Sequence, residues 1–149
     1  MTECPMYLLD TNVISELRKQ EKANLGVQQF FQNVIEQNSR IYISAVTIGE
    51  LRRGVDLIRY RGDQPQAELL ETWLQTILNH YADQILDFTA TEAQVWGRLR
   101  VPVANNAIDK QIAATALTYG LTLVTRNIKD FAGTGVPLLN PFEKFSKGN

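Results

Sequence analysis

Short runs of apolar residues alternate along the chain with longer segments whose apolar positions recur every three or four residues. The short runs are typical of buried strands, and each longer segment gathers its apolar side chains on one face, as an amphipathic helix does. The predicted strands cover residues 6–9, 41–43, 85–86 and 121–125, with a weak fifth strand near 136–139. The predicted helices cover residues 13–19, 24–37, 48–58, 65–81, 89–100 and a segment from 105 or 106 to 117.

The residues between these segments agree with the assignment. Asp10, Thr11 and Asn12 follow the first strand and are good helix-capping types, and either Ser44 or Thr47 can cap the helix after the second strand. Gly120 stands where a helix C-cap glycine belongs. Buried strands that alternate with amphipathic helices indicate an α/β domain with a mostly parallel sheet of four to five strands.

Composition limits the chemistry. A chain of 149 residues has the length of a single domain. No apolar run approaches the roughly 20 residues of a membrane span, so we expect a cytoplasmic protein without membrane association. Sixteen acids against fifteen bases give a net charge of −1, which does not favour general polyanion binding. One cysteine, Cys4, and one histidine, His80, exclude a disulfide framework and a zinc finger. The chemistry therefore falls mostly to carboxylates.

Carboxylates stand at or near the ends of the predicted strands, the edge at which parallel α/β sheets bind ligands. Asp10 ends the first strand, Glu50 lies a turn or two beyond the second, and Asp109 begins the helix that leads into the fourth. Asp130 follows the polar residues 125–127 that end the fourth strand. Each acid alone has an ordinary structural interpretation, as a helix cap, a first-turn residue or a solvated side chain. Together they predict a cluster.

A cluster of carboxylates needs a cation. Two carboxylates about 4 Å apart repel by about 4 kcal/mol at an effective dielectric constant of about 20. Ligand sets made only of oxygen favour Mg²⁺ or Mn²⁺ over zinc. Such an ion clamps phosphate oxygens and activates a water molecule, so the pattern predicts hydrolysis of a phosphodiester or phosphoryl group.

Four segments in order resemble the motifs of a known family. They are LLDTNVISE at 8–16, SAVTIGELRRG at 44–54, DKQIAATA at 109–116 and GLTLVTRN at 120–127, the last followed by Asp130 and Phe131. These segments resemble the PIN domains and, within them, the VapC-type toxins of prokaryotic toxin–antitoxin pairs. The first two look especially like the FitB-type branch, and the likeness runs from residue 6 to about residue 142.

The resemblance implies a single PIN domain over residues 1–149, with a three-layer α/β/α fold and the activity of a Mg²⁺- or Mn²⁺-dependent endoribonuclease. It implies that Asp10, Glu50 and Asp109 bind or position the metal. It also implies that Thr125 supplies a supporting hydroxyl and that the side chain of Asn12 orients the acids.

The fourth acidic position is open. Many members of the family carry Asp where this chain has Asn127, and the nearest acid is Asp130. An amide at 127 can still accept a hydrogen bond but adds no charge. Either Asn127 or Asp130 is therefore the fourth catalytic residue.

The resemblance also implies partners. These are an RNA substrate, a second copy of the chain in a homodimer, and a VapB-like antitoxin whose DNA-binding N-terminus makes the only contact to operator DNA. An antitoxin arginine that reaches the carboxylates would inhibit well, because guanidinium and carboxylate are geometrically matched. Arg52 and Arg53 are candidates for contacts to substrate phosphate, although ordinary surface charges or counterions of the crowded acids explain them equally well.

Two other functions compete with this interpretation. A phosphatase with an aspartyl nucleophile at Asp10 would need a second carboxylate two residues later, where Asn12 stands. A weakly active or inactive FitB-like subunit, which joins a DNA-binding partner in a repressor complex, is the alternative that the missing acid at 127 keeps open.

Overall fold

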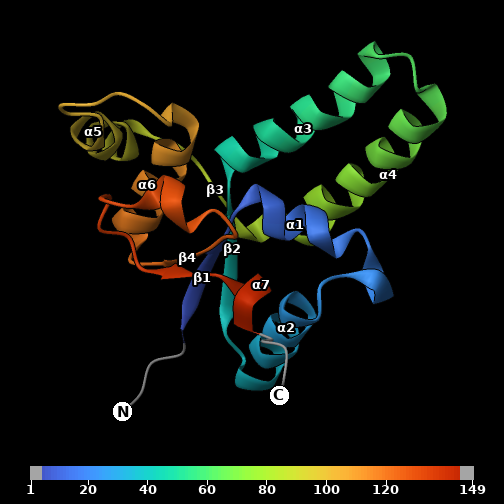
Figure 1. Cartoon of the computed structure of the whole chain (residues 1–149), viewed down its shortest axis with the longest axis horizontal. Helices are drawn as coiled ribbons and strands as arrows, with labels where there is room; N and C mark the ends of the chain where they lie inside the picture. The colour runs from blue at the N-terminus through green and yellow to red at the C-terminus, as the bar shows by residue number, and fades with distance from the viewer. Residues whose placement is uncertain (1–4, 145–149) are drawn as a thin grey trace.

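The computed structural model describes residues 5–144 and contains one sheet of five parallel strands, in the order β3-β2-β1-β4-β5 (Figure 1). Cys4 lies outside the described residues. The central strand β1 pairs with β2 on one side and with β4 on the other. The strands are β1 (Met6–Leu9), β2 (Arg40–Ser44), β3 (Ile85–Leu86), β4 (Thr122–Val124) and β5 (Leu138–Leu139). The predicted parallel sheet, including its weak fifth strand, is confirmed.

Helices connect the strands and cover both faces of the sheet (Figure 1). None of those in residues 5–144 has the length and apolar character to cross a membrane. The helices are α1 (Thr11–Leu17), α2 (Leu25–Gln37), α3 (Ala45–Tyr60), α4 (Gln64–His80), α5 (Ala90–Leu99), α6 (Ala107–Tyr119) and α7 (Pro141–Lys144), with short 3₁₀ turns η1 (Gln20–Lys22), η2 (Ala82–Gln84) and η3 (Ile128–Phe131). The sequence did not predict α7 or the 3₁₀ turns, which are too short to carry a periodic pattern.

Caps fix several of these boundaries. Of the two residues that could cap α3, Ser44 does so, because its hydroxyl accepts a hydrogen bond from the N–H of Val46. Asn24 caps α2 through the N–H groups of Gly26 and Val27. Gly120 ends α6 in the left-handed conformation, with φ of 67°, as the sequence predicted.

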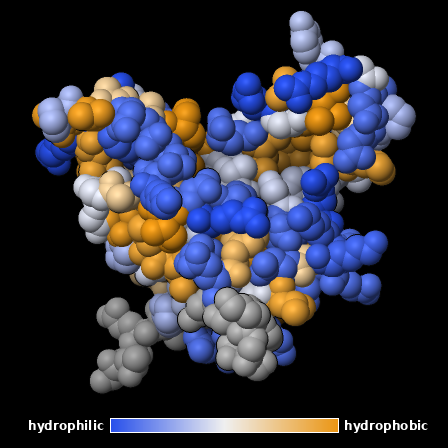
Figure 2. Space-filling view, in the orientation of Figure 1, coloured by the Kyte–Doolittle hydropathy of each residue, from blue (hydrophilic) through white to orange (hydrophobic). Residues whose placement is uncertain are grey.

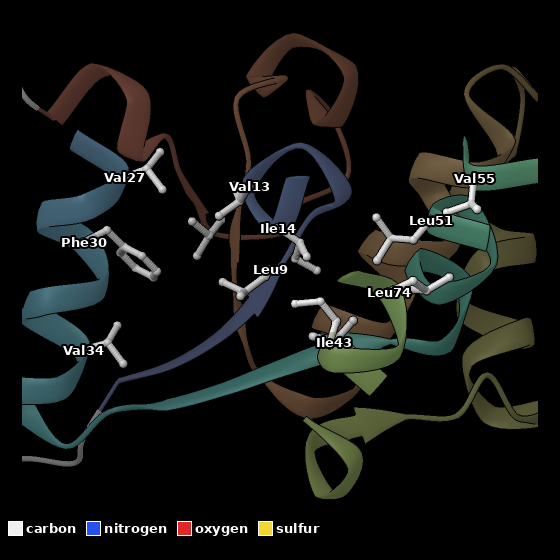
Figure 3. Packing of buried hydrophobic residues seen from close by; sticks show 12 residues of the cluster. Leu9, Val13, Ile14, Val27, Phe30, Val34, Ile43, Leu51, Val55 and Leu74 are labelled. Carbon is white, nitrogen blue, oxygen red and sulfur yellow. The ribbon is translucent and has the colours of Figure 1, made fainter. Parts of the chain in front are cut away.

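Successive residues of each strand enter two different cores, because side chains alternate across a sheet. On one face Leu9, Ile43 and Val124 pack with α1 to α4 (Figure 3). On the other face Leu8 and Leu123 pack against α6. The fold is thus a three-layer α/β/α sandwich, in which both faces of the sheet are buried and its strand ends are left for a site.

The short helix α7 lies on α2 at a position where α2 has no side chain. A Cβ atom added to Gly26 would lie 2.0 Å from the carbonyl oxygen of Pro141. The two backbones approach each other this closely only because residue 26 is glycine.

We predict that Gly26→Ala destabilises the protein by about 1–3 kcal/mol, since the added methyl group must displace the backbone of α7. Gly97→Ala is the matched control, because Gly97 lies in α5 and a methyl group added there would meet open space. That change should leave stability equal or raise it by up to about 1 kcal/mol. Urea unfolding of both variants measures the difference, and equal midpoints would refute the packing argument.

Candidate active site

The ends of β1 and β4 meet at one edge of the sheet and place Asp10 beside Thr125. The N–H of Asp10 donates to the carbonyl oxygen of Val124 at 2.9 Å, which continues the ladder between the strands. The hydroxyl of Thr125 then donates to Oδ2 of Asp10 at 2.7 Å, between residues 115 positions apart. Both side chains are buried.

Asn12 completes the network around these two residues. Its Nδ2 lies 3.3 Å from Oδ2 of Asp10 and 3.3 Å from Oγ1 of Thr125. Its Oδ1 accepts the N–H of Arg126 at 3.1 Å, and the N–H of Asn127 donates to Oγ1 of Thr125 at 3.0 Å. The side chain of Asn12 therefore bridges the two strand ends and fixes the direction of the Asp10 carboxylate.

Asp10 also caps α1, because its Oδ1 accepts the N–H of Thr11 at 2.8 Å. The capping interpretation and the functional one are both consistent with this geometry. Burial raises the pKa of the Asp10 carboxyl above its ordinary value, and the hydrogen bonds from Thr125, Thr11 and Asn12 oppose that shift. The nearby charge of Asp130 raises the pKa further.

Asp109 lies in the first turn of α6 and faces the other acids. Burial, together with the smaller effect of the negative charges of Asp10, Asp130 and Glu50, raises the pKa of its carboxyl to about 6. The charges of three acids from separate segments thus act on Asp109 at the strand ends. The neighbouring Lys110 does not neutralise them by an ion pair, because its Nζ donates to the carbonyl oxygen of Val103 and to Oδ1 of Asn105.

Asp130 and Asn127 differ in what they add to this cluster. Asp130, in η3, is close enough to act on the charges of both Asp10 and Asp109. Asn127 is exposed, and it is its backbone N–H that bonds to Thr125. Of the two candidates for the fourth position, Asp130 is the one that contributes negative charge to the site.

Glu50 lies in α3 and lines a cavity beside the site. The cavity has a volume of about 290 Å³ and lies between α1, α3 and α4, where Thr11, Ser15 and Arg18 also line it. Figure 2 shows a hollow between the α3–α4 hairpin and the α5–α6 side of the molecule, with hydrophilic residues gathered at the centre of the face below it.

The donor set suits a hard divalent cation, because it consists of carboxylate, hydroxyl and amide oxygens with no cysteine or histidine among them. The repulsion that adds to the effect of burial on the pKa of Asp109 is the kind that a bound cation relieves. Within residues 5–144, however, no three acidic, histidine or cysteine side chains already stand in a metal-binding arrangement. The acids face one another without forming a closed metal site.

Arg52 does not lie in this cluster. Its two terminal nitrogens each lie 2.7 Å from an oxygen of Glu71, and it also pairs with Asp56. Arg59 joins the same two acids. Arg52 therefore holds α3 against α4 and is not free for a phosphate. Arg53 is exposed and makes no ion pair in the described part of the chain, so a phosphate contact by Arg53 stays a prediction.

Arg126 is a basic residue beside the site to which the sequence pattern assigned no role. It follows Thr125 directly, and its N–H is held by Asn12. Its guanidinium lies over the ring of Phe142, 4.3 Å from the centroid. Only its position directly after Thr125 could have indicated from the sequence that Arg126 lies at the site. Nothing in the sequence near Arg126 indicates that it packs on Phe142.

Three comparisons identify similar proteins. The PIN domain family model matches residues 7–135. The chain is 36% identical to "Toxin FitB" of Neisseria gonorrhoeae, over 92% of this chain and 99% of the relative, and 29% identical to "VapC ribonuclease Y4jK" of Sinorhizobium fredii, over 93% and 99%. It also resembles the solved structure of FitAB bound to an IR36 DNA fragment, with a TM-score of 0.77 and 32% identity over 92% of this chain and 96% of the other.

We predict that Asp109→Asn stabilises the metal-free protein at high pH and not at low pH. Because the folded-state pKa of about 6 exceeds the ordinary value of 3.8, folding favours the protonated carboxyl. The contribution of the Asp109 carboxyl to stability is therefore fully present below about pH 4 and is lost as the pH rises through 6. In chelator at pH 7.5 the variant should melt higher by about 2–4 °C, which allows for the partial exposure of Asp109.

The control is Asp83→Asn, an exposed carboxylate in η2 at the amino end of β3. Its melting temperature should follow that of the wild type at both pH values. Thermal unfolding at pH 4 and 7.5 measures the effect, and an Asp109→Asn difference that does not change with pH would show that folding does not raise the pKa of Asp109.

Proposed function

The chain belongs to the PIN-domain family, and on that premise we propose that it is a divalent-metal-dependent endoribonuclease, the toxin of a toxin–antitoxin pair. The observation that carries the proposal is the set of four interacting carboxylates at the strand ends. Similarity to a toxin and to a ribonuclease over nearly the whole chain supports the same conclusion. The site is at the edge where parallel α/β sheets bind their ligands.

Asp10, Glu50 and Asp109 would hold the cation, with Asp130 as the fourth acid. A divalent cation bound there would supply charge neutralisation for the phosphodiester and activation of a water molecule. The chain's own side chains bind and orient the groups that take part in the reaction. Thr125 and Asn12 orient Oδ2 of Asp10, so that this buried carboxylate is already directed before substrate binds.

RNA is the proposed substrate because a relative that matches nearly the whole chain is named a ribonuclease. Hydrolysis by an activated water does not need the 2′-hydroxyl, so a preference for RNA over DNA has to come from contacts to that hydroxyl or to the shape of a single strand. RNA is abundant in the cytoplasm, where we expect the protein to act.

We further propose an antitoxin partner that carries the DNA contact, and a homodimeric toxin. The structural relative FitAB is a complex bound to DNA. The present chain has a net charge of only −1, which does not favour direct DNA binding. Operator DNA would thus be reached only through the partner.

A second function has its own support. The similarity to FitB, together with an amide at Asn127, favours a subunit that serves a DNA-binding partner and cleaves weakly or not at all. The two functions differ in one measurable property, which is cleavage of RNA by the chain purified without its partner.

We predict that the purified chain, verified free of antitoxin, cleaves RNA with Mg²⁺ or Mn²⁺, and that Asp109→Asn lowers the rate at least about 100-fold while the protein stays folded. Loss of residues that only orient metal ligands already costs about 10–100-fold. The assay uses total cellular RNA and a panel of single-stranded oligonucleotides, with circular dichroism to check the fold and Asp83→Asn as the carboxylate control.

Three outcomes separate the alternatives. An intact RNA panel with both metals would reject the nuclease and leave the partner subunit, which a DNA-shift assay of the complex tests. Full activity in Asp109→Asn would reject the site assignment alone. Cleavage that also fails in Asp83→Asn would point to damage of the fold.

We predict that Thr125→Val lowers turnover about 10–100-fold, whereas Thr125→Ser restores most of it, because the hydroxyl directs Asp10. The hydroxyl also lowers the pKa of Asp10, so its loss should raise that pKa further. Since Asp10 has to be ionised to hold a cation, the acid limb of the pH–rate profile should move to higher pH. A fall in turnover with an unchanged profile would mean that Thr125 contributes only to stability.

A further inference from the structure

We propose that the cleft between η3 and α7 is a second phosphate subsite, in which Arg126 holds the RNA phosphate next to the scissile one. The inference rests on the proposed ribonuclease function and adds to it a substrate contact outside the carboxylate cluster. Arg52 is paired with the carboxylates of Glu71 and Asp56, so the proposal assigns the phosphate contact to Arg126, which adjoins the site.

The cleft has the size and position for such a contact. It has a volume of about 470 Å³, and its lining includes Arg126, Asn127, Lys129, Asp130, Asn140 and Glu143. Asp130 belongs to both places, because it lines the cleft and its charge acts on Asp10 and Asp109. A strand whose phosphodiester lies against the acids therefore has this cleft as a neighbouring place for its next phosphate.

Arg126 is held in place on two sides. Its backbone N–H donates to Oδ1 of Asn12, the side chain that also bridges Asp10 and Thr125. Its guanidinium lies 4.3 Å from the centroid of the Phe142 ring, an arrangement that restricts the side chain and leaves the edge of the guanidinium accessible. A planar fork that is already oriented loses less entropy when it binds phosphate.

The donors of Arg126 are available. The side chain is exposed, and within residues 5–144 its guanidinium forms neither a hydrogen bond nor an ion pair, although its charge also acts on the carboxylate of Glu16. Arg52 and Arg59 differ in this respect, since both are paired with carboxylates. Lys129, also exposed, adds a second cation to the same cleft.

The mixed charge of the cleft favours a phosphate that is part of a strand. Asp130 lies in the same lining, and its negative charge opposes the binding of a free anion. A phosphate tethered to a strand already anchored at the acids is present at high effective concentration and needs only a weak contact. Free inorganic phosphate should therefore compete poorly.

The test measures RNA binding without cleavage. Asp109→Asn, which we expect to cleave too slowly to interfere, is the background at one fixed Mg²⁺ concentration, and a fluorescent single-stranded RNA is titrated at salt concentrations from 50 to 200 mM. The salt slope is the decrease in the logarithm of the binding constant per tenfold increase in salt concentration. Losing one phosphate contact on a single strand lowers this slope by about 0.7. Arg126→Ala should thus reduce the slope by about 0.7 and weaken binding about fivefold at 0.1 M salt. Arg126→Lys should keep the slope and lose only part of the affinity.

Arg40→Ala is the matched control, an exposed arginine at the start of β2, on the opposite edge of the sheet. It should keep the parent slope. A single-stranded DNA of the same sequence should show the same change with Arg126→Ala, because phosphate contacts do not read the sugar. A parent slope in Arg126→Ala, or an equal loss in Arg40→Ala, would overturn the subsite.

Failure of the subsite and failure of the nuclease are distinguishable. If wild-type protein cleaves RNA with metal but Arg126→Ala keeps the parent slope, the subsite alone is rejected. If Arg126→Ala lowers the slope while the wild type cleaves no RNA with either metal, the subsite stands as a nucleic-acid contact and the nuclease is rejected.

Discussion

The parallel register between β1 and β4 is the constraint on which the site depends. It pairs Leu9 with Val124, so the residues that follow each strand arrive at the same edge although most of the chain separates them. Asp10 and Thr125 then come within 2.7 Å of each other. A slip of one residue would turn every side chain of a strand to the other face. Because both faces are buried in separate cores, such a slip is costly, and the hydrophobic packing thereby fixes the hydrogen bond at the site.

The sequence predicted the parts of this structure that have a local signal. Strand runs, helical periodicity and capping residues each depend on neighbours in the chain, and the elements built from them are confirmed. The α/β pattern alone predicts that the acids gather at the strand ends, and their assignment as a catalytic cluster stays a prediction. The partner of Arg52 could not be predicted, because Glu71 belongs to another helix and depends on how α3 and α4 pack. The same holds for Arg126 on Phe142, a contact between a strand end and a helix with no periodic pattern.

The near-zero net charge conceals a separation of charges over the surface. Arg52 and Arg59 are neutralised within the α3–α4 hairpin by Glu71 and Asp56, so these bases do not balance the acids at the strand ends. The acids have no ion pair of their own in the described residues, while unpaired bases lie close by in the segment after β4. The total of −1 therefore says little about the field that a phosphodiester would meet.

The absence of a side chain at Gly26 also affects the edge of the site. Gly26 lets α7 settle against α2, and α7 carries the Phe142 ring on which Arg126 lies. The position of an exposed guanidinium thus depends on how α7 packs against α2. A larger residue at position 26 would therefore displace α7 and, with it, the ring beneath the arginine.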